Sequence, residues 1–281
     1  MTNGCDKVSF AIKNTNWCNM NCAHCCECSG SNIAPNLMPL SKVEKYIHDF
    51  NTMPLPRWEY MVFTGGETLA PYYFNRMTYI PQCLEFAAQY NMVPVVKTNG
   101  VWGNNDDLRK RILHDFASAA YRHNLLMSMD ISVDAFHNNE HAVFNILNDV
   151  ISSIYLAPAI RITLQSLDDK KSHTKMFNLI QSLDKNDLIV GTPENGTVPI
   201  EVPQSHMGLI FYDLGPLISK IGRAKKNNLG QTVPDGKPDI QTGHCLQIDN
   251  NDIATLNYKH SVPVNGRRLF DVTSELIRKV R

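Results

Sequence analysis

The sequence lacks a net charge, because its 281 residues hold 27 Lys and Arg against 27 Asp and Glu. Affinity for nucleic acids comes mostly from neutralising phosphates, so this balance indicates no nucleic-acid partner. Long apolar runs are also missing, since no stretch approaches the roughly 20 residues of a membrane span. The first residues lack the basic and then apolar regions of a secretory signal peptide. We therefore expect a cytoplasmic protein with no membrane partner.

What is present is an alternation of predicted strands and helices. Hydrophobic residues make up 43% of the chain, which is ordinary for a globular protein. Apolar runs predict six strands, at 10–12, 60–63, 93–96, 125–133, 160–164 and 188–190. Segments with helical periodicity separate them, one starting at 41 and the others at about 72–90, 106–123, 140–154 and 172–183. This order predicts an α/β fold with a parallel sheet, either barrel-like or doubly wound.

The alternation stops after about residue 195. Glycines and prolines gather between 227 and 243, and the tail that follows predicts a hairpin and a terminal helix over 272–280. We therefore expect two parts, a core over 1–195 and a C-terminal extension over 196–281.

Polar residues follow the predicted strands where each strand ends. They are a cysteine-rich loop after the first strand, Gly65-Gly66-Glu67 after the second, Asn99-Gly100 after the third, and Ser132 with Asp134 after the fourth. The carboxyl ends of parallel strands form the edge at which α/β folds build their sites. Each of these segments is also compatible with an ordinary turn, but their recurrence predicts a site at that edge.

The cysteines are concentrated in the first of these loops. Five of the eight cysteines lie between residues 18 and 28, and a cytosolic chain does not normally keep structural disulfides. Cys18, Cys22 and Cys25 have the spacing C-x3-C-x2-C, and three thiolates can hold three irons of a [4Fe–4S] cluster, leaving the fourth iron open. The alternative is a zinc site, which needs four closed ligands, with Cys26, Cys28 or His24 as the fourth.

With this cysteine motif the chain resembles the radical S-adenosylmethionine (SAM) superfamily over residues 7 to 260. The resemblance implies a partial (β/α)6 TIM barrel with a short C-terminal extension. It implies that Cys18, Cys22 and Cys25 ligate a [4Fe–4S] cluster, whose open iron takes the amino and carboxylate groups of SAM. The reduced cluster would cleave SAM to a 5′-deoxyadenosyl radical, which abstracts a hydrogen atom from the substrate. An electron donor such as flavodoxin or ferredoxin is implied as a partner.

The same resemblance implies roles for the residues that follow the strands. Gly65, Gly66 and Glu67 match the segment that binds the methionine part of SAM, with Glu67 accepting from its ammonium group. The resemblance further implies that Ser132 and Asp134, and similarly Asn99, contact the ribose. It implies that His24 packs near the adenine.

A narrower resemblance is to a subgroup that modifies ribosomally made peptides, including peptide epimerases. It is carried by Cys25-Cys26, by the motifs after strands two to four, and by 217–224 before His244-Cys245. That subgroup continues into an auxiliary-cluster (SPASM or twitch) domain, but here no cysteine follows Cys245. A single cysteine cannot hold an auxiliary cluster, so the extension corresponds to a degenerate version. Cys245 is then either a catalytic hydrogen-atom donor to a substrate radical or a buried remnant.

The sequence leaves three functions open. The first is a radical SAM enzyme that epimerises or cross-links a peptide. The second is a radical SAM enzyme acting on a small metabolite or nucleoside. The third is a metal-binding regulatory protein that catalyses no reaction.

Overall fold

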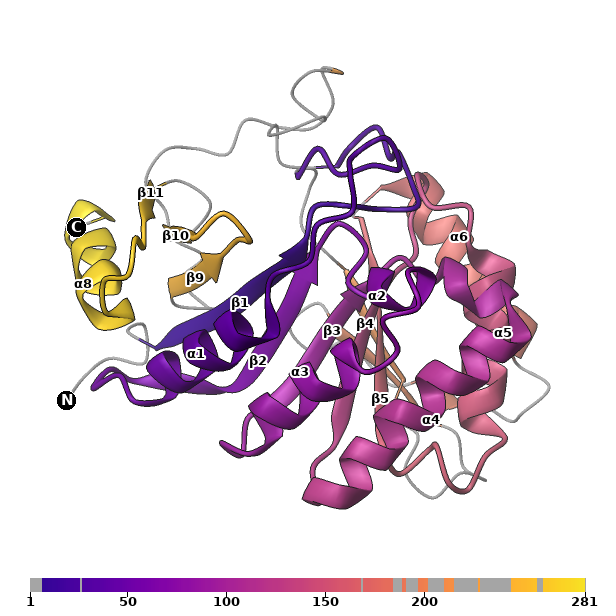
Figure 1. Cartoon of the computed structure of the whole chain (residues 1–281). Coiled ribbons are helices and arrows are strands. Elements are labelled where there is room, and N and C mark those ends of the chain that lie inside the picture. The colour runs from indigo at the N-terminus through magenta and orange to yellow at the C-terminus, as the bar shows by residue number, and fades with distance from the viewer. Residues whose placement is uncertain are drawn as a thin grey trace. The chain divides into compact units, whose positions relative to one another are not determined.

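A computed structural model describes residues 7–25, 27–167, 169–183, 189–190, 197–201, 210–214, 227, 244–256 and 260–280 (Figure 1). The chain divides into two compact units. The first comprises residues 1–21, 29–94 and 233–281, and the second comprises 22–28 and 95–232.

The first unit contains a mixed sheet in the order β11-β10-β9-β1-β2. Strand β1 (Val8–Thr15) pairs in parallel with β2 (Arg57–Gly65) on one side and with β9 (His244–Ile248) on the other. Strands β10 (Ile253–Leu256) and β11 (His260–Pro263) continue the sheet as an antiparallel hairpin. The predicted hairpin of the tail is thus confirmed, and it extends the sheet that contains β1.

The helices of this unit are α1 (Leu40–Asn51), α2 (Ala70–Tyr73), α3 (Tyr79–Ala88) and α8 (Leu269–Val280). Helix α1 contacts β1 and α3, and α8 contacts β10 and β11. The rings of Phe10 on β1 and Phe50 on α1 stack with centroids 4.6 Å apart, and both side chains are fully buried. Burying two aromatic side chains removes a large apolar area from water, so this contact fixes the helix against the strand.

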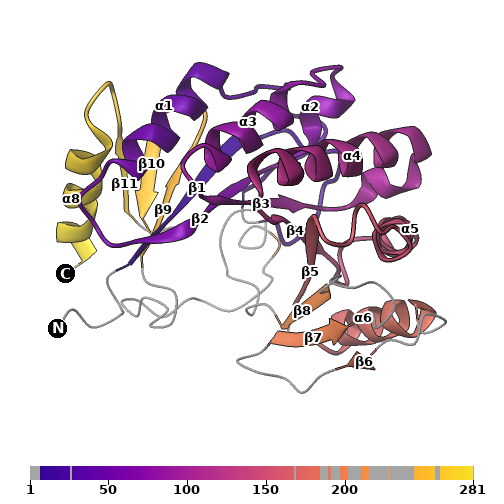
Figure 2. The same cartoon turned by 90° about the horizontal axis from the view of Figure 1, so that it is seen from below.

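The second unit contains strands in the order β3-β4-β5-β8-β7-β6. Strands β3 (Val93–Thr98), β4 (Met127–Ser132), β5 (Ile160–Ser166) and β8 (Ile210–Leu214) are parallel. The connecting helical segments are η2 (Val101–Asn104), α4 (Asp106–His123), α5 (Glu140–Ile151) and α6 (Lys170–Leu183). Helix α4 contacts β4 and β5, and α5 contacts η2 (Figure 2). Because β3 and β4 are parallel, the residues that follow them lie at one edge.

One predicted strand has a different role. Residues 188–190 were expected to form the sixth parallel strand, but β6 (Ile189–Val190) pairs antiparallel with β7 (Thr197–Glu201). The parallel neighbour of β5 is β8, from the segment predicted to be C-terminal extension. Sequence periodicity identifies strands but not their direction, which explains the error. The fold is α/β with a parallel sheet, while the count of six β/α units and the division at residue 195 stay predictions.

The local sequence explains why α4 begins and ends where predicted. The Asn105 side chain accepts a hydrogen bond from the Leu108 backbone N–H, and two aspartates occupy the first turn. Arg122 and His123 lie in the last turn, and Asn124 ends the helix in the left-handed conformation with φ 51°. Acidic residues near the start and basic ones near the end both complement the helix dipole.

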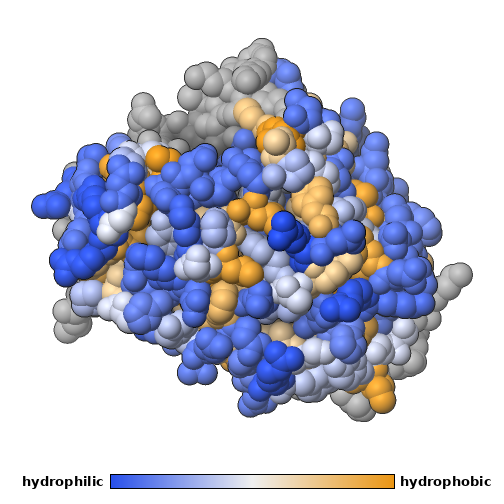
Figure 3. Space-filling model, viewed as in Figure 1, coloured by the Kyte–Doolittle hydropathy of each residue, from blue (hydrophilic) through white to orange (hydrophobic). Residues whose placement is uncertain are grey.

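The surface mixes polar and apolar residues. Hydrophobic residues are dispersed among hydrophilic ones on the face shown in Figure 3. Among the described residues, no helix has the length and hydrophobicity that crossing a lipid bilayer requires.

Candidate active site

In the first unit, the cysteine loop is tied to the Gly-Gly-Glu segment through the backbone. Gly66 N–H donates to the Thr15 carbonyl oxygen at 2.8 Å, and Glu67 N–H donates to the Trp17 carbonyl oxygen, also at 2.8 Å. Thr15 ends β1 and Trp17 immediately precedes Cys18, so these two bonds fix the start of the cysteine loop beside the end of β2.

Both glycines are required by this close approach. Gly65 has φ +132°, and a Cβ on it would lie 2.3 Å from the Thr15 oxygen. A Cβ on Gly66 would lie 2.0 Å from the Trp17 oxygen. Because neither glycine has a Cβ, the backbone of this turn can pack directly against the start of the cysteine loop. The sequence did not predict this packing.

Glu67 is fully buried behind this turn. Its Oε1 accepts from the Leu69 backbone N–H at 3.1 Å. A carboxylate offers about four acceptor positions, so one carboxylate can accept from several donors. Burial raises the pKa of Tyr73, and the neighbouring charges of Glu67 and Cys18 act in the same direction.

Aromatic rings cover the start of the cysteine loop in this unit. The Trp17 ring lies edge-on to Phe74, with centroids 4.7 Å apart, and tilted to Tyr73 at 5.9 Å. The Tyr73 hydroxyl also accepts a hydrogen bond from the Asn19 side chain at 3.2 Å. The residues that flank Cys18 are thus held in place by the side chains of Tyr73 and Phe74.

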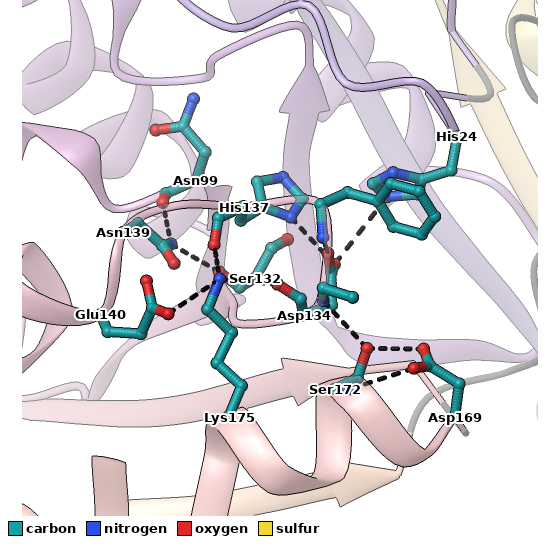
Figure 4. Close-up of polar contacts among 12 residues, drawn as sticks. His24, Asn99, Ser132, Asp134, His137, Asn139, Glu140, Asp169, Ser172 and Lys175 are labelled. Atoms are coloured by element: carbon teal, nitrogen blue, oxygen red, sulfur yellow. Dashed lines mark hydrogen bonds and ion pairs between the residues drawn. The ribbon is translucent and has the colours of Figure 1, made fainter. Parts of the chain in front are cut away.

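In the second unit, two histidines converge on Asp134 just after β4 (Figure 4). His137 Nδ1 lies 2.9 Å and His24 Nε2 lies 3.8 Å from Asp134 Oδ2. Oδ1 accepts from the Phe136 backbone N–H at 2.8 Å. The His24 ring lies 4.4 Å from the Phe136 ring, centroid to centroid, and 5.4 Å from His137. The cysteine loop and the end of β4 are therefore in contact through side chains.

The charges in this group reinforce one another. Burial alone would lower the pKa of His137, but hydrogen bonds to Asp134 and to Cys22 outweigh it and raise the pKa to about 9. Burial alone would raise the pKa of Asp134, but the His137 hydrogen bond and the charges of both histidines hold it below its usual value. An ionised Asp134 is the form that can accept hydrogen bonds from hydroxyl groups.

Asn139 fixes the ends of two strands at this edge. Its Nδ2 donates to the Asn99 carbonyl oxygen at 2.5 Å and to the Ser132 carbonyl oxygen at 2.7 Å. Asn99 follows β3 and Ser132 ends β4, so a single buried amide holds the predicted site residues of both strands (Figure 4). The sequence analysis missed Asn139, because an Asn before a helix looks like an N-cap.

Helix α6 supports the loop that carries Asp134. The Lys175 ammonium donates to the Asp134 carbonyl oxygen at 3.0 Å and to the His137 carbonyl oxygen, and it lies 3.1 Å from a Glu140 carboxylate oxygen. The Ser172 hydroxyl accepts from the Ala135 backbone N–H at 3.0 Å. These contacts hold the 134–137 loop from below (Figure 4).

The cysteine loop supplies the donor set that a cluster needs. Cys18 belongs to the first unit, whereas Cys22 and Cys25 belong to the second, where Cys25 N–H donates to the Cys22 carbonyl oxygen at 3.2 Å. Soft thiolate ligands on one short loop fit an iron–sulfur cluster better than a hard cation. Cys26 and residues 217–224 lie outside the described residues.

Another donor set lies within the second unit. Ligand atoms of His24, Asp134 and His137 lie within 4.8 Å of one another, a spacing suited to a single ion. A [4Fe–4S] cluster instead binds each thiolate through a different iron, so its ligands stand farther apart. The two arrangements can be distinguished by the metal that the protein holds.

The backbone register places Cys245 near the other end of β1. Cys245 pairs with Ser9, whereas the cysteine loop follows Thr15. From Ser9 to Thr15 a strand rises about 20 Å, at about 3.3 Å per residue. Whether Cys245 is a hydrogen-atom donor or a buried remnant stays a prediction.

Comparison with known proteins gives structural neighbours only. No protein-family model and no curated protein matches the sequence. The crystal structure of Streptococcus suis SuiB bound to S-adenosylmethionine matches with a TM-score of 0.58 and 11% identity, covering 99% of this chain and 68% of SuiB. SuiB bound to precursor peptide SuiA matches at 0.46 and 10%, covering 95% and 64%. Native anSMEcpe with bound AdoMet matches at 0.41 and 17%, covering 64% and 50%. At these identities the first match establishes a shared fold.

Proposed function

We propose that this chain is a radical SAM enzyme whose [4Fe–4S] cluster is held by Cys18, Cys22 and Cys25. The observation that carries the proposal is the backbone tie between the cysteine loop and Gly66-Glu67, at the carboxyl ends of adjacent parallel strands. The fold shared with SuiB, which was crystallised with S-adenosylmethionine, supports it. When bound, the cluster and SAM would supply a 5′-deoxyadenosyl radical that abstracts a hydrogen atom from substrate.

The chain's own residues would bind and orient SAM. Glu67 is proposed to accept from the methionine ammonium group. Asp134, with Ser132 and Asn99, is proposed to accept from the ribose hydroxyls, and His24 is proposed to stack near the adenine. The His24 ring already lies against an aromatic ring, which favours a planar ligand there.

The proposed substrate is a ribosomally made peptide. This part of the proposal rests on the motifs after strands two to four, which resemble those of the peptide-modifying subgroup. A small metabolite or nucleoside is the alternative. Incubating the reconstituted enzyme and SAM with a candidate precursor peptide tests the choice, since only a true substrate should increase 5′-deoxyadenosine formation and change in mass or stereochemistry.

Glu67 gives a direct test of SAM binding. Glu67→Gln keeps an oxygen for the Leu69 N–H but removes the negative charge. A charge-assisted hydrogen bond contributes roughly 1.5–3 kcal/mol, so SAM affinity should fall about tenfold to hundredfold. Iron content should stay unchanged. If calorimetry measured the same SAM affinity for the variant and the wild type, Glu67 would have only a structural role within the turn.

Cys245 gives a test of the hydrogen-donor role. The register places Cys245 far from the cysteine loop along β1, so Cys245→Ala should form both 5′-deoxyadenosine and finished product at the wild-type yield. Product analysis by mass spectrometry and chiral chromatography measures this. If the variant formed 5′-deoxyadenosine but no finished product, Cys245 would be the donor after all.

A second candidate function is metal binding without catalysis. It is favoured by the histidine–aspartate group, in which three ligand atoms already lie within reach of one ion. The variant with Cys18, Cys22 and Cys25 all replaced by alanine distinguishes the two functions. The second candidate would be favoured if that variant bound zinc or cobalt stoichiometrically and the wild-type protein made no 5′-deoxyadenosine.

A further inference from the structure

A pocket of about 390 Å³ lies in the first unit, at the start of helix α1. Its lining comes from two segments, residues 35–40, which lead into α1, and residues 74–79, which lead into α3. These two helices lie side by side (Figure 1). Pockets that bind small molecules have volumes of roughly 300–1,000 Å³, so this one suits a ligand about as large as one bulky amino acid.

The wall of this pocket is mostly apolar and is fixed by hydrogen bonds. Its apolar residues include Leu37, Met38, Leu40, Phe74 and Tyr79. The Tyr79 hydroxyl donates to the carbonyl oxygen of the fully buried Met38 at 2.7 Å, which joins the two segments. Leu37 forms a β-bridge with Thr15 at the end of β1. A wall that is already ordered loses little conformational entropy when a ligand binds.

The pocket is positively charged. Of the described residues that line it, only Arg76 has a charged side chain. That side chain is exposed, and no acidic residue within the described ranges forms an ion pair with its guanidinium. The first turns of α1 and α3 contain no acidic residue either. A carboxylate in a ligand would therefore find an available partner in Arg76, with which it can form two parallel hydrogen bonds.

The pocket and the guanidinium together select a carboxylate that is attached to a bulky apolar group. A free amino acid has both groups, but it also has an ammonium group, and the described lining offers no carboxylate to pair with it. The C-terminal residue of a peptide has its carboxylate and its side chain on the same Cα, and its nitrogen belongs to an uncharged amide. The end of a peptide chain therefore matches this lining best.

We propose that this pocket binds the C-terminal residue of a peptide, with the carboxylate on Arg76 and a bulky apolar side chain against the apolar wall. The identification of this peptide as the substrate rests on the proposed function. Phe74 joins the pocket to the cysteine loop, because its ring also lies edge-on to Trp17, immediately before Cys18. Binding one end of the peptide selects the residue that reacts by its distance from that end.

The test is the binding of N-acetyl-phenylalanine and of N-acetyl-phenylalanine amide to the reconstituted full chain, measured by ligand-observed NMR titration. The first probe has the carboxylate and the apolar side chain of a C-terminal residue, and the second lacks only the negative charge. The acid should bind about tenfold more tightly than the amide, because it gains charge-assisted hydrogen bonds. Arg76→Gln should reduce the affinity for the acid to that for the amide.

Arg268→Gln is the matched control, because it removes an exposed guanidinium of the same unit that does not line the pocket. Its affinity for the acid should equal that of the wild type. Leu40→Asp gives a second test if Arg76→Gln does not fold. It adds a carboxylate to the lining in the first turn of α1, where acidic residues stabilise a helix, so it should fold and lose binding of the acid.

Equal wild-type affinities for the acid and the amide, or no detectable binding of either, would overturn the inference. Free phenylalanine that binds as tightly as N-acetyl-phenylalanine would also overturn it, because the ligand would then be an amino acid. A chain that binds the acid as expected but forms no 5′-deoxyadenosine from SAM and dithionite would instead overturn the proposed function and leave the pocket assignment intact.

Discussion

Cys22→Ala should abolish the iron–sulfur cluster and, with it, all formation of 5′-deoxyadenosine. Three thiolates hold three irons of a [4Fe–4S] cluster and leave the fourth open for SAM, so the loss of one leaves two irons without a thiolate of the motif. Cys18→Ala and Cys25→Ala should behave in the same way. Iron and sulfide analysis after anaerobic reconstitution measures the first effect, and chromatography of the SAM products measures the second.

Cys28→Ala is the matched control, because Cys28 lies in the same loop but outside the three-cysteine motif. It should keep about four irons per chain and wild-type 5′-deoxyadenosine formation. If Cys22→Ala retained four irons while Cys28→Ala lost them, the assignment of cluster ligands would be wrong.

Gly66→Ala should disrupt the site without removing any side chain that is proposed to bind the cluster or SAM. The new Cβ would lie 2.0 Å from the Trp17 carbonyl oxygen, so the turn must move away from the cysteine loop. Overpacking and two weakened backbone hydrogen bonds together cost about 3 kcal/mol. The apoprotein should melt roughly 5–10 °C lower than the wild type. SAM binding should fall as well, because the Glu67 backbone moves with the turn.

Gly266→Ala is the comparison for this variant. Gly266 has φ +74°, but a Cβ there would meet nothing within 4 Å. It therefore carries only the backbone strain of the left-handed conformation, roughly 1–2 kcal/mol, and should leave SAM affinity unchanged. An equal loss of stability in both variants, with SAM affinity intact in both, would show that the tie at Gly66 does not organise the site.

The sequence predicted most of the elements that carry the site. Helix α4 was predicted from its helical periodicity, and the first five strands were predicted because each is a short apolar run. The segment 72–90 was expected to be one helix but forms α2 and α3. The break lies at Asn75, which has φ 55°, and Pro81 then falls in the first turn of α3, where proline is tolerated.

The supporting contacts of the site could not be predicted. Asn139 bonds to two carbonyl oxygens from segments 40 and 7 residues away in sequence. Lys175 contacts the 134–137 loop from helix α6. No spacing in the sequence indicates the contacts of Asn139 or of Lys175. Motif residues follow from local chemistry, whereas these partners depend on how the strands lie side by side.

The central claim is that the cysteine loop holds a redox cluster that cleaves SAM. The most direct test is anaerobic reconstitution of the full chain, followed by incubation with SAM and dithionite. We predict about four irons per chain and formation of 5′-deoxyadenosine that requires both the cluster and the reductant. A reconstituted protein that binds iron but forms no 5′-deoxyadenosine under these conditions, with or without candidate peptides, would contradict the account.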